Sequence, residues 1–286
     1  MTDTTWNLPA LRSSTYPTPE DLADRRAGVA AMLNAEPAAG VEVTRRDLGG
    51  VACVVCTPAE PQRTIVHFHG GGYRLGSPEA SIPFASKLAA ATSSRVVAVT
   101  YRLAPEHPYP AAVLDATAAY AAVLEEYRGE VVVAGESAGG GLAAALALAC
   151  LGSGVAVPDA LVLMSPWVDL TVTAATYTAN AATDVLFSHE SASQAAEMYL
   201  QGHDTSDPLA SPLFGELAGL PRTMVLASTD EVLLTDATSL SARLAAAGVE
   251  VLASLQPGRQ HAWPAIFPDE DASTRALEMI SGFLRS

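Results

Sequence analysis

Two glycine-flanked motifs carry the groups in this chain that could do chemistry. Residues 135–139 read GESAG and lie between the apolar stretch 131–134 and a long alanine- and leucine-rich segment. A serine at such a strand-to-helix turn has a strained backbone and an outward-facing hydroxyl that a base can reach. This context predicts that Ser137 is the nucleophile of a serine hydrolase.

The second motif, HGGG at 69–72, follows an apolar stretch of its own at 64–68. Its glycines present backbone N–H groups with no side chains in the way, and such groups can stabilise the oxyanion of an acyl-transfer intermediate. We therefore expect an oxyanion hole close to the serine.

A serine nucleophile needs a base, and the base needs an acid group that fixes its tautomer. In hydrolases whose serine lies on such a turn, the acid follows the serine along the chain and the base follows the acid. Of the six histidines, His261 alone follows the last strand-like stretch, 249–254. We expect His261 to be the base.

The acid should follow the strand-like stretch 223–228. Three carboxylates compete for this position, namely Asp230, Glu231 and Asp236. Asp236 would lie more than a turn into the next helix and point sideways or to water. Asp230 could instead cap that helix, which is a frequent role of aspartate. We favour Asp230 as the acid, with Glu231 as the next candidate.

Strand-like and helical stretches alternate from residue 64 onward. The strand candidates lie at 64–68, 95–100, 131–134, 160–164, 223–228 and 249–254, after a predicted hairpin at 41–47 and 51–57. Helical patterns lie near 18–35, 78–92, 111–127, 139–151, 190–200, 231–247 and 270–285. This alternation predicts an α/β fold with a mostly parallel eight-stranded sheet and helices on both faces. Right-handed crossovers would bring the loops that follow the strands to one edge of the sheet.

Residues 167–220 interrupt this alternation, because they contain no convincing strand and one helical stretch. A segment of this length without a strand is usually an insertion packed over an active site. We expect it to form a helical cap together with residues of about 1–40. The whole chain, 1–286, would then be a single domain.

Composition and charge narrow the range of ligands and compartments. The formal net charge of −15 argues against nucleic acid and against an anionic membrane surface as partners. Residues 1–14 lack the pattern of a secretory signal, and no stretch is long and apolar enough to span a bilayer. These features favour a cytoplasmic protein that acts on a small molecule.

The three cysteines do not indicate a disulfide framework. Cys53 and Cys56 form a C-x-x-C motif, but it lies on the strand candidate 51–57. Residues three apart on a strand point to opposite faces, so these two thiols cannot share a metal ion. We expect no metal and no cofactor.

Taken together, these motifs resemble the hormone-sensitive-lipase branch of the α/β-hydrolases, which includes bacterial carboxylesterases. The resemblance covers nearly the whole chain from about residue 20. It rests on HGGGY at 69–73, YRLAPE at 101–106, GESAGG at 135–140, SPWVDL at 165–170, DPLASP at 207–212, DEVLL at 230–234 and His261. Within this branch the chain looks most like the monoterpene-lactone-hydrolase and heroin-esterase-like members.

The resemblance implies site residues as well as a fold. The nucleophile, acid and base of the family fall on Ser137, Asp230 and His261. Its oxyanion donors fall on the backbone N–H groups of Gly71, Gly72 and Ala138.

Two departures from the family pattern lie next to these residues. Glu231 and Val232 follow the acid where many relatives carry Pro-Leu. Glu136 replaces the aspartate that is commoner beside the nucleophile, and we interpret it as a structural neighbour of the site.

The expected function is that of a serine carboxylesterase, which hydrolyses short- to medium-chain esters through an acyl-enzyme. One alternative is a lactone hydrolase for cyclic or terpenoid esters, which would use the same residues. A remote alternative is a non-catalytic binding protein, because plant gibberellin receptors resemble the family but lack the catalytic histidine. Tyr73 and Trp167 are candidate walls of the substrate pocket. A homodimer formed through the last strand, as in relatives, is a further expectation.

Overall fold

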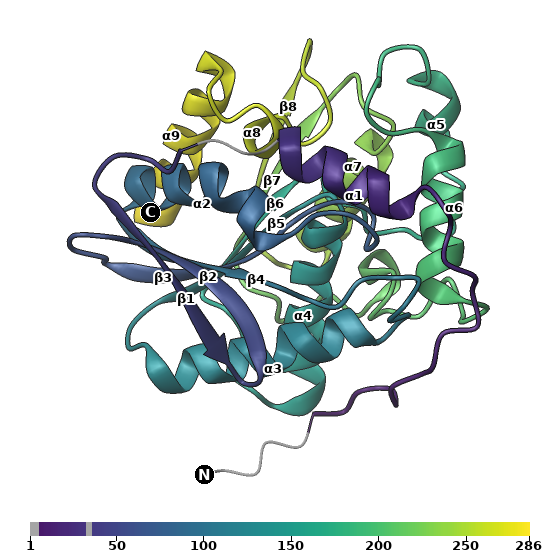
Figure 1. Ribbon diagram of the computed structural model, residues 1–286. Helices are drawn as coiled ribbons and strands as arrows, with labels where there is room; N and C mark the ends of the chain where they lie inside the picture. The colour runs from purple at the N-terminus through teal and green to yellow at the C-terminus, as the bar shows by residue number, and fades with distance from the viewer. Residues whose placement is uncertain (1–5, 33–35) are drawn as a thin grey trace.

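A computed structural model describes residues 6–32 and 36–286 (Figure 1). The first residues of the predicted cap segment 1–40 and residues 33–35 of the helix predicted at 18–35 lie outside the described residues.

One sheet of eight strands runs through the described residues, in the order β1-β2-β4-β3-β5-β6-β7-β8. The strands are β1 (Val41–Leu48), β2 (Val51–Pro58), β3 (Arg63–Phe68), β4 (Ser94–Val99), β5 (Val131–Glu136), β6 (Ala160–Met164), β7 (Thr223–Ser228) and β8 (Val251–Gln256). Strand β2 is antiparallel to both β1 and β4, and all other pairs are parallel. The predicted mostly parallel eight-stranded sheet is confirmed.

The residues of the strands explain this arrangement. The central strands β5 and β6 are buried along their whole length, as expected for parallel strands that are covered on both faces. Gly49 and Gly50 join β1 to β2 with φ angles of 65° and 79°. Two consecutive positive φ angles are characteristic of the turn that closes a tight hairpin.

Helices cover both faces of the sheet. They are α1 (Leu22–Met32), α2 (Pro78–Thr92), α3 (Ala111–Glu126), α4 (Ala138–Ser153), α5 (Thr176–Ala179), α6 (His189–Leu200), α7 (Leu234–Ala246), α8 (Trp263–Ile266) and α9 (Asp271–Arg285). Figure 1 shows α2 and α9 on one face, and α3 and α4 on the other. The four-residue helices α5 and α8 were not predicted, because they are too short to give a periodic pattern.

The two faces of strand β2 separate its cysteines as predicted. Cys53 packs into the core on the side of α3 and α4, whereas Cys56 packs among residues of α2 and α9. Both thiols are free, and burial raises their pKa values to about 12 and about 11. They are therefore protonated hydrophobic side chains of the core.

Helix α4 is buried on every side from Ala138 to Cys150, and a helix that is apolar all round belongs in a protein interior. Its small residues allow close backbone contact. A Cβ atom on Gly141 would lie 2.2 Å from the carbonyl oxygen of Trp167. This packing fixes the N-terminal end of α4, where Ser137 lies.

Two arginines of the N-terminal segment bind backbone carbonyls elsewhere in the chain, one at the end of α6 and one just after the HGGG loop. The Arg12 guanidinium donates hydrogen bonds of 2.8 Å to the carbonyl oxygens of Leu200 and Gln201, at the end of α6. Arg26 on α1 donates to the Arg74 carbonyl at 2.9 Å. No helix in the described residues is long and apolar enough to cross a membrane.

Candidate active site

Ser137 lies at the sharp turn between β5 and α4. Its φ of 55° and ψ of −123° are a strained combination for a residue with a side chain. The turn depends on flanking glycines, since a Cβ on Gly135 would lie 2.2 Å from the Gly139 carbonyl oxygen. A Cβ on Gly139 would lie 2.0 Å from the carbonyl oxygen of Phe68. Backbone atoms therefore leave no room for larger residues on either side of the serine.

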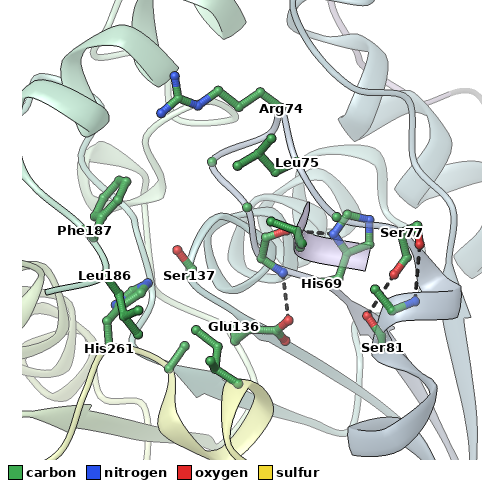
Figure 2. Close-up of a pocket in the computed structure, with 18 of the residues that line it drawn as sticks. His69, Arg74, Leu75, Ser77, Ser81, Glu136, Ser137, Leu186, Phe187 and His261 are labelled. Carbon is green, nitrogen blue, oxygen red and sulfur yellow. Dashed lines mark hydrogen bonds between the residues drawn. The ribbon is translucent and has the colours of Figure 1, made fainter. Parts of the chain in front are cut away.

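Ser137 and His261 line the same cavity, which has a volume of about 300 Å³. Figure 2 draws both residues at the wall of this cavity, and the ring of Phe187 stacks on that of His261. The residues expected as nucleophile and base thus lie together, although the chain separates them by more than a hundred positions.

Glu231, and not Asp230, binds the imidazole. The Nδ1–H of His261 donates to Oε2 of Glu231 at 2.8 Å, and Glu231 is fully buried. Asp230 instead accepts the N–H of Gly258 at 2.8 Å and the hydroxyl of Thr229 at 3.0 Å. The prediction that Asp230 holds the base is therefore wrong, and the second candidate occupies that position.

A turn at the end of β7 explains this exchange. The Ser228 hydroxyl accepts the N–H of Asp230 at 3.0 Å and donates to the Arg259 carbonyl at 2.7 Å. This turn directs the side chain of Asp230 to the N–H of Gly258. The longer side chain of Glu231 lies against the last residue of β7, because its Oε1 accepts the N–H of Ser228 at 3.1 Å.

The third candidate acid, Asp236, does not point to water as predicted. It is buried, and its Oδ2 accepts the N–H groups of Val168 and Asp169 at 2.9 and 3.0 Å. Burial raises its pKa to about 8. Asp236 thus fixes the backbone that follows β6 and has no contact with the imidazole of His261.

The HGGG loop leaves some backbone N–H groups free of protein acceptors. The N–H of Gly70 donates to Oε1 of Glu136 at 2.7 Å. The N–H groups of Gly71, Gly72 and Ala138 have no acceptor within the described part of the chain. Gly71 has a φ of +113°, and a Cβ there would lie 2.3 Å from the Leu75 carbonyl oxygen. Only glycine therefore allows this turn.

Glu136 ties this loop to the strand that carries the serine. Its Oε2 accepts a hydrogen bond of 2.7 Å from Nε2 of His67, while its Oε1 holds Gly70. Its side chain is 9% exposed. These contacts agree with the interpretation of Glu136 as a structural neighbour of the site.

His69 also lines the cavity, and its ring is held against the HGGG loop. Its Nδ1 donates to the Gly70 carbonyl at 2.7 Å, and its ring stacks on Tyr101 at 4.4 Å. Burial lowers the pKa of His69, so the ring is neutral and supports the turn.

Tyr73 and Trp167 do not line the cavity, which corrects the prediction that they form its walls. Tyr73 has a φ of 59° and stacks on Tyr199 at 3.9 Å, within an aromatic cluster behind the site. Phe187 lies between Trp167 and His261, with ring centroids 5.7 and 5.6 Å from them. Phe187 therefore forms the wall, and Trp167 supports it from behind.

Known proteins are similar to this chain in sequence and in fold. Residues 65–265 match a protein family that is described as having the alpha/beta hydrolase fold. An acetyl-hydrolase of Streptomyces hygroscopicus is 40% identical over 226 residues, which cover 78% of this chain and 76% of that protein. An esterase of Acinetobacter venetianus is 36% identical over 203 residues, or 70% of this chain and 67% of that protein.

Solved structures give the same result. An esterase from the bacterial hormone-sensitive lipase family is 34% identical with a TM-score of 0.89, and the match covers 95% of this chain and 93% of that chain. A hormone-sensitive lipase from a metagenome library is 36% identical with the same TM-score, covering 94% and 93% of the two chains. The chain therefore belongs to the hormone-sensitive-lipase branch of the α/β-hydrolases, a family of ester-hydrolysing enzymes.

Proposed function

We propose that this carboxylic-ester hydrolase cleaves short- to medium-chain esters with Ser137 as nucleophile, His261 as base and Glu231 as the acid that orients the base. The hydrogen bond from His261 to Glu231, in the cavity that Ser137 also lines, carries this proposal. A non-catalytic binding protein is not supported, because the relatives are named as hydrolases.

The chemistry follows from the positions of these groups. Because Nδ1–H of His261 donates to Glu231, its Nε2 is free to accept the Ser137 proton as the oxygen attacks the ester carbonyl. The N–H groups of Gly71, Gly72 and Ala138 would stabilise the oxyanion. The imidazolium then gives its proton to the leaving alcohol. Water, deprotonated by the same ring, hydrolyses the acyl-enzyme and returns the serine.

The size and lining of the cavity support small substrates. A volume of about 300 Å³ lies at the lower limit for ligand pockets. Leu186, Phe187 and Ile266 give it an apolar lining, to which Val29 of α1 also contributes. These contacts support the proposal that residues of about 1–40 and 167–220 form a cap on a single domain.

The predicted homodimer and cytoplasmic location remain predictions. Strand β8 lies at the edge of the sheet, where Leu252 and Leu255 are exposed. An exposed apolar edge strand is a surface on which a second copy could pair.

A substrate panel tests the proposal against its alternative, a lactone hydrolase. We expect kcat/KM to be highest for p-nitrophenyl acetate and butyrate and to fall for the dodecanoate, because the cavity is small. Terpenoid lactones should be poorer substrates than the short esters. A fluorophosphonate should label Ser137, which peptide mass spectrometry identifies. Lactone turnover above that of every linear ester would favour the alternative.

The pH profile of the wild-type enzyme gives a second prediction. Burial of His261 disfavours its charged form, but the hydrogen bond and charge of Glu231 outweigh this and raise its pKa above 6.5. A base must be neutral to act, so activity is present above this pKa and is lost as the pH falls through it. We expect the acidic limb of kcat/KM for p-nitrophenyl acetate to lie above pH 6.5. A limb below this value would contradict the prediction.

A further inference from the structure

The predicted cap contains a segment, residues 176–187, that holds the loop of the proposed acid. Every backbone carbonyl from Thr229 to Val232 accepts a side-chain hydrogen bond from this segment. Asn180 donates to the carbonyl oxygens of Thr229 and Glu231 at 2.9 and 2.8 Å. Thr183 donates to the Asp230 carbonyl at 2.7 Å, and Thr176 donates to the Val232 carbonyl at 2.7 Å.

Asp184 adds a contact in the opposite direction, in which a side chain of this segment is the acceptor. Its Oδ2 accepts the N–H of Val232 at 2.9 Å, directly after Glu231. Its Oδ1 accepts the N–H groups of Leu186 and Phe187 at 3.0 and 2.9 Å. The side chain is buried, and three N–H donors satisfy its two oxygens.

These two sets of contacts belong to different parts of the site. Leu186 and Phe187 line the cavity, and the Phe187 ring stacks on His261 with an interplanar angle of 18°. Val232 belongs to the loop that carries Glu231. A carboxylate that only closed its own turn would use one oxygen, whereas Asp184 sends the other to a residue 48 positions away.

We infer that Asp184 is a positioning residue that locks the cavity wall to the acid loop, so that a substrate seated against Phe187 and the carboxylate of Glu231 share one rigid support. The inference rests on the proposed function. Asp184 touches neither the reacting atoms nor the imidazole in this arrangement, and it acts through Val232 and Phe187.

The substitution Asp184→Asn keeps one of the two links, the bonds to the cavity wall, and removes the other, the bond to the acid loop. The asparagine oxygen can still accept the N–H groups of Leu186 and Phe187, so the turn of the wall is retained. The new amide group then faces the N–H of Val232, and two donors cannot bond to each other. Asp184→Ala removes both links. Asp204→Asn is the matched control, because Asp204 closes an exposed turn by accepting the N–H of Ser206 at 2.9 Å.

We expect Asp184→Asn to lower kcat about 10-fold while KM for p-nitrophenyl acetate stays near the wild-type value. Asp184→Ala should lower kcat at least as much and also raise KM, because the wall loses its support. Asp204→Asn should match the wild type in both constants. Thermal melting curves of each variant check that the fold is retained.

Two further measurements separate positioning from a general structural role. The Nδ1 proton of His261, bound to Glu231, should give a downfield proton resonance that His261→Ala lacks and that Asp184→Asn broadens or removes. The acidic limb of kcat/KM should also move to lower pH in Asp184→Asn. The charged groups that act on His261 are Glu231, Asp184 and Glu136, and this variant removes one negative charge.

A further variant weakens a neighbouring bond between the same segment and the acid loop. Thr183 is exposed, so Thr183→Val removes its bond to the Asp230 carbonyl without burying a polar group. It should lower kcat by a smaller factor, about 2- to 3-fold, and weaken the same resonance. Wild-type kcat with an unchanged resonance in Asp184→Asn, or in Asp184→Ala where the asparagine variant does not fold, would overturn the inference. The resonance does not depend on turnover, whereas failure of the proposed function would show as hydrolysis that persists in Ser137→Ala.

Discussion

Ser137→Ala is expected to lower kcat for p-nitrophenyl esters by about 10⁶-fold. The substitution removes the attacking oxygen, while the cavity and the free N–H groups remain. An alanine methyl group is smaller than the serine side chain and meets no new neighbour, so the fold should persist. Steady-state kinetics and a melting curve of the same preparation measure the two effects.

A matched serine provides the control for this variant. Ser13 is exposed in the N-terminal segment, and Ser13→Ala should keep wild-type activity. Retention of more than a trace of activity in Ser137→Ala, after correction for spontaneous ester hydrolysis, would remove Ser137 from the mechanism.

Glu231→Gln should lower kcat by about 10⁴-fold, and the geometry explains why an uncharged near-isostere is so damaging. The N–H of Ser228 donates to one oxygen of Glu231, so the glutamine oxygen will occupy that side. Its amide group then faces Nδ1 of His261 and donates to it. The proton of the ring moves to Nε2, where it blocks acceptance of the Ser137 proton.

Asp230→Asn is the counterpart that distinguishes the two adjacent carboxylates. Asp230 contacts Gly258 and Thr229 and makes no contact with the imidazole, and an asparagine oxygen can keep the bond to Gly258. Activity should stay within about 10-fold of the wild type. Parallel kinetics of the two variants decide between them, and a larger loss in Asp230→Asn than in Glu231→Gln would return the role to Asp230.

Much of the fold could be predicted because its signals are local. Buried parallel strands are short apolar runs bounded by turns, and all eight predicted strands overlap the observed ones. The positions of Ser137 and His261 followed from the same pattern, since parallel strands bring their C-terminal loops to one edge.

The identity of the acid and of the cavity wall could not be predicted in this way. Both depend on the direction in which loop side chains point, and sequence periodicity gives no information on this. Whether Asp230 or Glu231 faces the histidine is set by the Ser228 hydroxyl, which binds the next turn and a distant carbonyl. The one local signal for this arrangement is a serine, Ser228, two residues before the adjacent carboxylates. Phe187 lies in a segment without helical or strand periodicity, so no pattern indicated its place beside the ring.

The glycine contacts around the nucleophile have a consequence for how this enzyme could diverge or be engineered. An added methyl group at Gly135 or Gly139 would strike carbonyl oxygens at 2.2 and 2.0 Å, and these belong to the main chain. Main-chain atoms move only with the helix or strand that carries them, here α4 and β3, so libraries randomised there should yield inactive clones. New substrate scope must come from the side chains opposite, on α1 and residues 186–191, where replacements change volume without displacing the turn.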